Sequence, residues 1–199
     1  MPTIFCVGKN YADHVREMGD AVEASDPPVV FLKPWTALVH PPDPIRLPTD
    51  IGEIQHEVEV VVRVGADRQP EQVALGLDLT ARTLQGEAKR RGLPWAAAKG
   101  FRGSAPVGPF VPVEDAPPLD ALRFTLTVNG KIRQRGDTAT MIRPVPTLLE
   151  WIDDWFGLAE GDLVFTGTPE GVGPLGVGNA VALCASDSAA LGTSWSVVE

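Results

Sequence analysis

The sequence predicts an α+β fold dominated by short strands and organised as a single domain over residues 1–199. Its 20 glycines and 19 prolines favour many turns between short elements over a bundle of long helices. Residues 56–64 alternate like a half-buried strand, and residues 124–132 have the pattern of a β-hairpin. No linker, internal repeat or low-complexity tract divides the chain, and a chain of this length buries roughly 70% of its unfolded surface.

The first part of the chain predicts two short strands on either side of a helix. Apolar residues 4–7 and 29–32 are the strands. Between them, residues 11–18 have helical composition, and Asn10 is a suitable N-cap for that helix. Residues 19–28 are acidic and small and end in proline, so we expect an exposed loop there.

The strand expected at residues 56–64 separates its side chains onto two faces, because successive side chains point to opposite sides. One face carries Val58, Val60, Val62 and Val64, and the other carries Glu57, Glu59, Val61 and Arg63. Residues 79–91 follow as a predicted helix, with Gly92 as its C-cap.

The second half of the chain predicts a hairpin, a helix and a final strand. Asn129 and Gly130, the preferred pair for a type I′ turn, stand between two alternating segments. The stripe of apolar residues that predicts the helix, which ends at Gly157, is Leu148, Leu149, Ile152, Trp155 and Phe156. Residues 163–166 are the last clear strand, and a glycine-rich loop follows at residues 167–173.

Composition excludes several classes of function. The formal net charge is −9 and there is no basic tract, which argues against a nucleic-acid partner. Cys6 and Cys184 lie far apart in the sequence, so we expect neither a disulfide framework nor a thiolate zinc site. We see no signal peptide, and no apolar run approaches the roughly 18–20 residues that cross a bilayer. We therefore expect no membrane partner and a cytoplasmic location.

Three acidic residues are candidates for a metal site. Glu57 and Glu59 are two apart on the predicted strand, so their carboxylates point to the same side. Mg²⁺ prefers such oxygen ligands and keeps positions open for water or substrate, although two solvated glutamates on an outer face give the same pattern. Asp78 lies in an apolar run at a strand–helix junction. It either caps the helix or needs a partner if it is buried.

His14 and Glu17 share one face of the first predicted helix. A carboxylate raises the basicity of a neighbouring imidazole and fixes its tautomer, as a water-activating base requires, although surface ion pairs have the same spacing. Lys99 lies among small apolar residues and would bind a carboxylate or enolate, or else be a solvated loop lysine. The loop at 167–173 is either a tight turn or a backbone wall for a small anion, and it matches no nucleotide-binding glycine motif.

Seven segments together resemble the fumarylacetoacetate hydrolase family, in the family's order and over nearly the whole chain. They are residues 8–18, 31–34, 56–59, 77–82, 92–95, 128–130 and 166–173. The likeness is closest to the family's short, single-domain acylpyruvase and oxaloacetate decarboxylase members. The resemblance implies a mixed β-roll of the type that forms the family's C-terminal domain, usually in a homodimer.

The resemblance also implies the residues of a site. Those that match the family's ligands for a divalent metal, Mg²⁺ or alternatively Mn²⁺, are Glu57, Glu59 and Asp78. His14 and Glu17 match its water-activating pair, in a segment that often orders as a lid over substrate, and Lys99 matches its active-site lysine. The residues expected to line the pocket and hold the substrate carboxylate are Arg82, Gln85 and Thr168.

The chain departs from the family's pattern at four positions. Thr83 and Asn179 each replace a common aspartate. Arg102 stands where many members carry aspartate, and Arg143 where many carry an aromatic residue. None of these positions is a ligand or part of the His–Glu pair. The two arginines would change the substrate if either reached the pocket.

The function that the resemblance implies is metal-dependent hydrolysis of acylpyruvates, which gives pyruvate and a carboxylic acid. Two alternatives share the same metal site: decarboxylation of oxaloacetate, and isomerisation or decarboxylation of dienoates from aromatic catabolism. An alternative of another class is a catalytically silent protein that binds 2-oxo acids.

Overall fold

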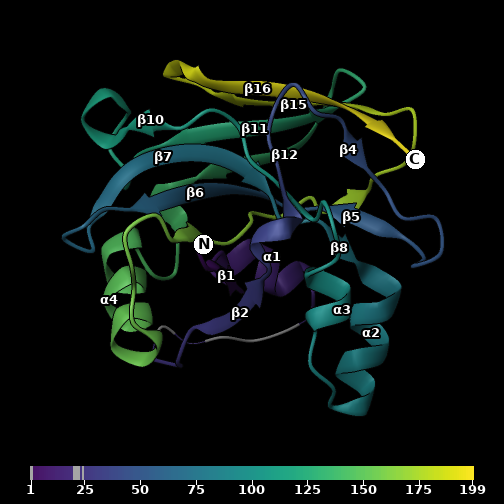
Figure 1. Ribbon diagram of the computed structural model, residues 1–199, viewed down its shortest axis with the longest axis horizontal. Coiled ribbons are helices and arrows are strands. Elements are labelled where there is room, and N and C mark those ends of the chain that lie inside the picture. The colour runs from purple at the N-terminus through teal and green to yellow at the C-terminus, as the bar shows by residue number, and fades with distance from the viewer. Residues whose placement is uncertain (1, 20–22, 24) are drawn as a thin grey trace.

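The computed structural model describes residues 2–19, 23 and 25–199, and its strands form two larger and two smaller sheets (Figure 1). The six-stranded sheet has the order β10–β7–β6–β13–β1–β2. Its strands are β1 (Ile4–Gly8), β2 (Val29–Lys33), β6 (Val58–Val64), β7 (Pro70–Leu77), β10 (Val111–Pro112) and β13 (Leu163–Phe165).

The five-stranded sheet has the order β12–β11–β15–β16–β4. Its strands are β4 (Ile45–Arg46), β11 (Arg123–Val128), β12 (Lys131–Asp137), β15 (Ala180–Ala185) and β16 (Ser188–Val198). The smaller sheets contain β5 (Ile54–His56) between β14 (Gly173–Pro174) and β8 (Thr80–Ala81), and the pair of β3 (Leu38–Val39) with β9 (Ala105–Pro106). β1 pairs with β13 in parallel and with β2 antiparallel, so the six-stranded sheet is mixed.

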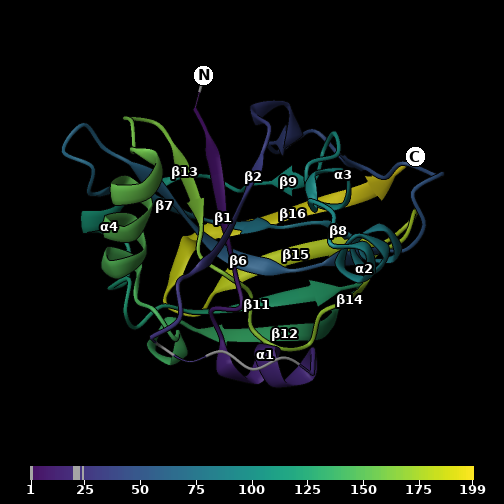
Figure 2. The ribbon, with the colours of Figure 1, turned by 90° about the horizontal axis from the view of Figure 1, so that it is seen from below.

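The helices lie at the ends and edges of the sheets. They are α1 (Ala12–Glu17), α2 (Arg82–Arg91), α3 (Ala96–Lys99) and α4 (Val145–Phe156), with single 3₁₀ turns at η1 (Trp35–Ala37), η2 (Val113–Asp115) and η3 (Thr138–Thr140). Both views place α4 at one end of the molecule and the α2–α3 pair at the other (Figures 1 and 2). This strand-rich, mixed α+β architecture confirms the expected fold class. No helix in the described ranges is long and apolar enough to span a membrane.

The β6 strand is buried on both faces and joins three parts of the core. Val58 and Val60 pack in the largest cluster, with side chains of the five-stranded sheet such as Leu126 and Leu183. Val62 and Val64 pack instead under α4, in the cluster with Leu148, Leu149 and Ile152. Val61, on the opposite face, packs with Ile4 and Phe165. The alternating valines therefore predict the strand correctly. Its other face is also covered, because Val61 packs in the cluster that contains Ala37 and Ala105.

Several local predictions are confirmed. β11 and β12 form the expected hairpin, and Asn129 and Gly130 both have positive φ, at 51° and 73°. The expected loop is exposed at residues 19, 23 and 25–27 but buried at Pro28, and residues 20–22 and 24 lie outside the described residues. Cys6 and Cys184 are free, as expected.

Other local predictions are wrong at their edges. α2 begins at Arg82 instead of residue 79, because Thr80 and Ala81 pair with β5 as β8. Asn10 does not cap α1. Its side-chain amide instead donates to the backbone carbonyls of Arg143 and Thr166 and accepts from the backbone N–H of Arg143.

The apolar stripe of α4 is shorter than expected. Its residues Trp155 and Phe156 are 70% and 51% exposed, although the ring of Phe156 still contacts that of Phe5 in β1, with centroids 5.7 Å apart. Trp155 stacks on Trp151 instead, with ring centroids 5.3 Å apart.

Candidate metal centre and active site

Three acidic side chains converge where β6 and β7 meet. Glu57 lies in the break between β5 and β6, Glu59 is the second residue of β6, and Asp78 directly follows β7. Because Val58 pairs with Leu77 across these antiparallel strands, Asp78 falls beside Glu57. The backbone N–H of Asp78 donates a 2.8 Å hydrogen bond to the carbonyl of Glu57. Oxygens of the three carboxylates lie within 4.8 Å of one another.

All three carboxylates are buried, at 5% exposure for Glu57, 2% for Glu59 and 1% for Asp78. The alternative of two solvated glutamates on an outer face is therefore wrong. The capping alternative for Asp78 is also wrong, because the N-cap residue of α2 is Ala81 and no side chain caps it.

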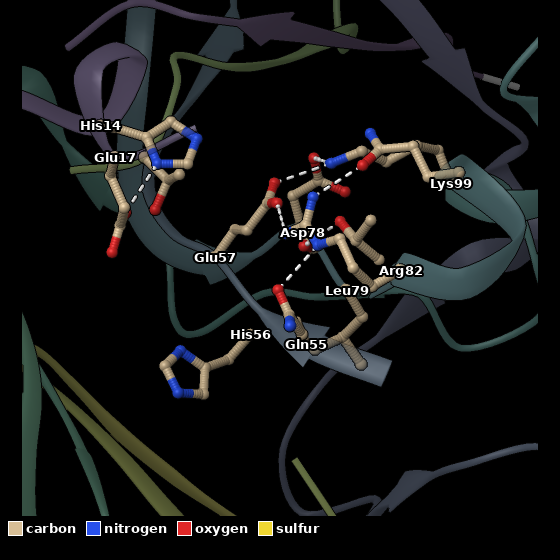
Figure 3. A network of polar contacts seen from close by, with 12 residues as sticks. His14, Glu17, Gln55, His56, Glu57, Asp78, Leu79, Arg82 and Lys99 are labelled. Atoms are coloured by element: carbon tan, nitrogen blue, oxygen red, sulfur yellow. Dashed lines mark hydrogen bonds and ion pairs between the residues drawn. The ribbon is translucent and has the colours of Figure 1, made fainter. Parts of the chain in front are cut away.

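Three cationic side chains surround this cluster, and Figure 3 labels two of them, Lys99 and Arg82. Lys99 Nζ, from the end of α3, lies 2.7 Å from Glu57 Oε2 and 2.5 Å from Asp78 Oδ2. Lys33 Nζ lies 2.8 Å from the other oxygen of Asp78, and Arg82 Nη2 lies 2.5 Å from Glu57 Oε1. Lys99 is 3% exposed, so the alternative of a solvated loop lysine is wrong.

These contacts govern the ionisation of Glu57 and Lys99. Burial disfavours the Glu57 carboxylate, but the charges of Lys99 and Arg82 outweigh it and hold the pKa of Glu57 well below its usual range. Burial likewise disfavours the ammonium of Lys99. The charges of Asp78 and Glu57 outweigh that cost and raise the pKa of Lys99. Both groups are therefore ionised at neutral pH.

Glu59 differs because no described residue forms an ion pair with it. Burial raises its pKa, and the neighbouring charges of Asp78 and Glu57 raise it further. Its carboxylate accepts a 2.6 Å hydrogen bond from the backbone N–H of Gly167. A buried carboxylate without a cation, facing two more carboxylates, is a donor set of hard oxygens that suits Mg²⁺ or Mn²⁺. The residues present therefore fit a divalent metal.

His14 and Glu17 form a second group, on α1. His14 Nδ1 and Glu17 Oε2 are 3.2 Å apart, and His14 is 8% exposed (Figure 3). The Glu17 carboxylate also accepts from the backbone N–H of Gly171, at 3.1 and 3.2 Å from its two oxygens. Since a carboxylate accepts, His14 carries a hydrogen on Nδ1, and its Nε2 is the atom left for proton transfer.

A cavity of about 40 Å³ joins the two groups, and a single water molecule needs only roughly 10–15 Å³. Every residue that the sequence predicts for the site except Glu17 lines it: His14, Glu57, Glu59, Asp78, Arg82, Gln85, Lys99 and Thr168. Glu17 contacts the cavity only through His14. The loop at residues 167–173 contacts α1 through the backbone N–H of Gly171, and its role as a backbone wall for a small anion stays a prediction.

Arg82 is already engaged by protein groups. Besides Glu57, it donates to Gln55 Oε1 at 2.7 Å and to Gln85 Oε1 at 2.6 Å. Its guanidinium therefore orients Glu57 and Gln85 in addition to any contact with substrate. Thr168 is engaged as well, since its hydroxyl donates to the carbonyl of Val58 at 2.8 Å.

Neither of the unusual arginines lines this cavity. Arg102 lines a separate cavity of about 840 Å³ beside β3 and β4. Arg143 is buried, and its guanidinium donates to the backbone carbonyls of Glu23, at 3.0 Å, and of Asp26.

Lys33 is the residue that sequence reasoning missed. It is 2% exposed, and besides Asp78 it contacts Ser104 Oγ at 3.0 Å and the carbonyl of Leu79 at 3.2 Å. The available signal was a lysine at the end of an apolar strand, inside a segment that resembles the family. Such a lysine is almost never fully buried without a partner.

A family model described as fumarylacetoacetate (FAA) hydrolase C-terminal matches residues 3–194. The chain belongs to the fumarylacetoacetate hydrolase family. This confirms the resemblance, and the fold is the strand-rich C-terminal domain fold of that family. The protein is thus a member of a family of enzymes, with three buried carboxylates as its candidate divalent-metal site.

Several family members resemble this chain closely. An oxaloacetate tautomerase, mitochondrial, of Mus musculus is 45% identical over 182 residues, covering 86% of this chain and 81% of that protein. An oxaloacetate tautomerase of Escherichia coli is 42% identical over 188 residues, covering 88% and 84%. Among solved structures, a fumarylpyruvate hydrolase of Pseudomonas aeruginosa in complex with Mn²⁺ and pyruvate has a TM-score of 0.91 and 34% identity, covering 100% and 90%.

Proposed function

We propose that this member of the family is a divalent-metal-dependent enzyme of small 2-oxo acids, and that it interconverts the keto and enol forms of oxaloacetate. The observation that carries the proposal is that His14 lines the same cavity as the three buried carboxylates. The relatives that are 42–45% identical are oxaloacetate tautomerases, which supports this substrate ahead of the acylpyruvate that the sequence alone favours.

In this proposal, Glu57, Glu59 and Asp78 hold Mg²⁺, or Mn²⁺ as in the Pseudomonas relative. When bound there, the cation polarises the 2-oxo group and lowers the cost of forming an enolate. Lys99 adds a fixed positive charge beside the same carboxylates, where it stabilises negative charge on the enolate oxygen.

His14 Nε2 moves the proton. Oxaloacetate has an acidic C–H bond at C3, between its ketone and its second carboxylate. Nε2 accepts that proton, and protonation of the enolate oxygen then gives the enol. Glu17, held by the backbone of Gly171, keeps the imidazole in the tautomer that this transfer needs and stabilises the imidazolium. Gln85, Arg82 and Thr168 bind and orient the 2-oxo acid at the cavity wall.

Acylpyruvate hydrolysis is the second candidate, because the same His14–Glu17 pair also suits activation of water. In that reaction a water molecule gives a proton to His14 and attacks the distal ketone. The bond between C3 and C4 then breaks and leaves a carboxylic acid and the enolate of pyruvate. The Pseudomonas relative, named a fumarylpyruvate hydrolase, supports this reading.

One set of assays separates the candidates. Purified protein with Mg²⁺ is given the enol form of oxaloacetate, and the loss of enol absorbance is followed together with the appearance of pyruvate. Rapid loss of enol without pyruvate supports the tautomerase, and matching release of pyruvate indicates a decarboxylase. Loss of acetylpyruvate in a parallel assay indicates the hydrolase. If no substrate reacts faster than in buffer with any divalent metal, the proposed function fails, and a silent 2-oxo acid binder is the better account.

A further inference from the structure

Gln134 lies at the centre of a buried hydrogen-bond network that the proposed reaction does not use directly. It belongs to β12, in the five-stranded sheet, and is 1% exposed. Its Oε1 accepts from His56 Nδ1 at 2.9 Å and from the backbone N–H of Val58 at 3.1 Å. Its Nε2 donates to Thr168 Oγ1 at 2.8 Å and to the carbonyl of Pro169 at 2.9 Å. All four hydrogen bonds that a primary amide makes most readily are therefore satisfied.

The two sides of this amide reach the two halves of the candidate site. His56 and Val58 are the chain neighbours of Glu57, so both residues that flank this carboxylate are tied to one oxygen atom. Thr168, on the other side, lines the cavity. In Figure 3 the ring of His56 points away from the cluster around Glu57, toward the opposite side of the strand.

A β-bulge accompanies the inward position of Gln134. The pairing of β11 with β12 shifts its register between Leu126 and Thr127, so that Gln134 pairs with Leu126 and Ile132 with Thr127. The extra residue is Arg133, whose carbonyl lies against Gly171 of the glycine-rich loop. Bulges beside active sites commonly redirect a side chain, which is what is seen here.

The hydrogen-bond directions in this network are determined by the main chain. Val58 N–H can only donate and the carbonyl of Pro169 can only accept, so the amide of Gln134 has one orientation. His56 must then carry its hydrogen on Nδ1. The Thr168 hydroxyl, which donates to the carbonyl of Val58, is left with a lone pair for Gln134.

We propose that Gln134 is a positioning residue that couples the carboxylate of Glu57 to Thr168 and so sets the distance between the metal and the substrate's anchoring wall. The roles of Glu57 and Thr168 rest on the proposed function. In this proposal, a change in the position of Glu57 on metal binding also moves its neighbours His56 and Val58. Because the Gln134 amide is hydrogen-bonded to both of them and to Thr168, the loop that carries Thr168 moves as well.

Two substitutions of Gln134 distinguish the role of its amide oxygen from the role of its amide nitrogen. Gln134→Glu keeps an oxygen for His56 and Val58 but removes both donors to Thr168 and Pro169. We expect KM for the 2-oxo acid to rise roughly five- to ten-fold, as the loss of one or two neutral hydrogen bonds predicts, with kcat and the Kd for Mn²⁺ nearly unchanged. Gln134→Leu removes all four hydrogen bonds. We expect the Kd for Mn²⁺ to rise about ten-fold or more, because the loss of groups that hold metal ligands in place typically weakens metal binding by that factor.

The matched control is Arg135→Gln, because Arg135 is the exposed neighbour on the same strand and should leave both constants unchanged. A double-mutant cycle of Gln134→Glu with Thr168→Val should be non-additive in KM. If both Gln134 variants lower only the melting temperature and leave KM and the Kd for Mn²⁺ at wild-type values, Gln134 is merely structural and the proposal is wrong.

Two further readouts do not depend on turnover or on a variant that folds. ¹⁵N NMR of the wild-type histidines should show His56 with its hydrogen on Nδ1, and its signals should shift when Mg²⁺ is added. The proposed coupling is wrong if His56 carries its hydrogen on Nε2. It is also wrong if Mg²⁺ binds to the protein and the His56 signals do not shift. If the wild type binds Mn²⁺ but acts on no 2-oxo acid, the proposed function alone fails, and the Mn²⁺ and NMR measurements still decide the role of Gln134.

Discussion

Glu59 accepts a 2.6 Å hydrogen bond from the backbone N–H of Gly167, so the glycine-rich loop holds the one carboxylate of the cluster that has no ion pair among the described residues. The loop approaches this closely because residue 167 is glycine. Its φ is +102°, and a Cβ there would lie 2.7 Å from the Cβ of Asn10. The main chain of residue 167 thus orients the carboxylate of Glu59, a candidate metal ligand more than 100 residues away in the sequence.

Glu59→Gln should uncouple metal binding from folding. Glutamine keeps an acceptor for Gly167 but removes the buried negative charge, so the metal-free protein should be at least as stable as the wild type. Metal affinity should fall by more than about 100-fold, since losing even an outer partner of a ligand costs roughly 10–100-fold. Thermal unfolding with and without Mg²⁺ checks both effects. A variant that Mg²⁺ stabilises as strongly as the wild type would remove Glu59 from the site.

His14→Ala should abolish proton transfer without loss of the metal. A positioned general base contributes about 10²–10⁴-fold in rate, and we expect kcat to fall by that factor while the Kd for Mn²⁺ stays constant. The control is His40→Ala, because His40 is exposed and outside the cavity. Stopped-flow measurement of oxaloacetate enol decay compares the two. Equal rates in both variants would exclude His14 as the base.

Gly171→Ala should disturb the site through Glu17. Gly171 has a φ of +92°, and an added Cβ would overlap the carbonyl oxygen of Arg133, so the loop must shift and its N–H must leave Glu17. Gly178→Ala is the matched control, with a φ of +85° and no atom within 4 Å of the added Cβ. Both variants carry the backbone strain, but only the first should lower kcat. Circular dichroism and kcat measured side by side test this, and equal losses of kcat would contradict it.

Asp153→Asn should change how stability depends on pH. The backbone N–H of Leu158 and then the charge of Arg68 lower the pKa of Asp153. A carboxyl with a depressed folded pKa stabilises the protein above its unfolded pKa of roughly 4, and that contribution is lost as pH falls through the folded value. The variant should be less stable than the wild type at pH 7, with the difference shrinking below about pH 4. Urea unfolding at several pH values measures it, with Asp154→Asn as the exposed control. A difference that is independent of pH would refute the assignment.

The sequence alone determined the local features of this protein, because these depend on residues that are neighbours in the chain. The Asn129-Gly130 turn, the alternating valines of β6 and the first turns of α4 follow from backbone preferences and apolar periodicity, and all three are where they were expected. The resemblance likewise named the residues that line one cavity, because the motifs that carry chemistry are short and continuous.

Only the tertiary structure decided which polar groups are buried and against what. Thr80 and Ala81 do not join the expected helix, because β5 offers them strand partners. Asn10 caps no helix because Arg143 and Thr166 bond it from more than 130 residues away. Lys33 and Gln134 carry no local signal strong enough to mark them. A buried charge or amide is stable only when distant segments supply its partners, and those partners meet only after the sheets have packed.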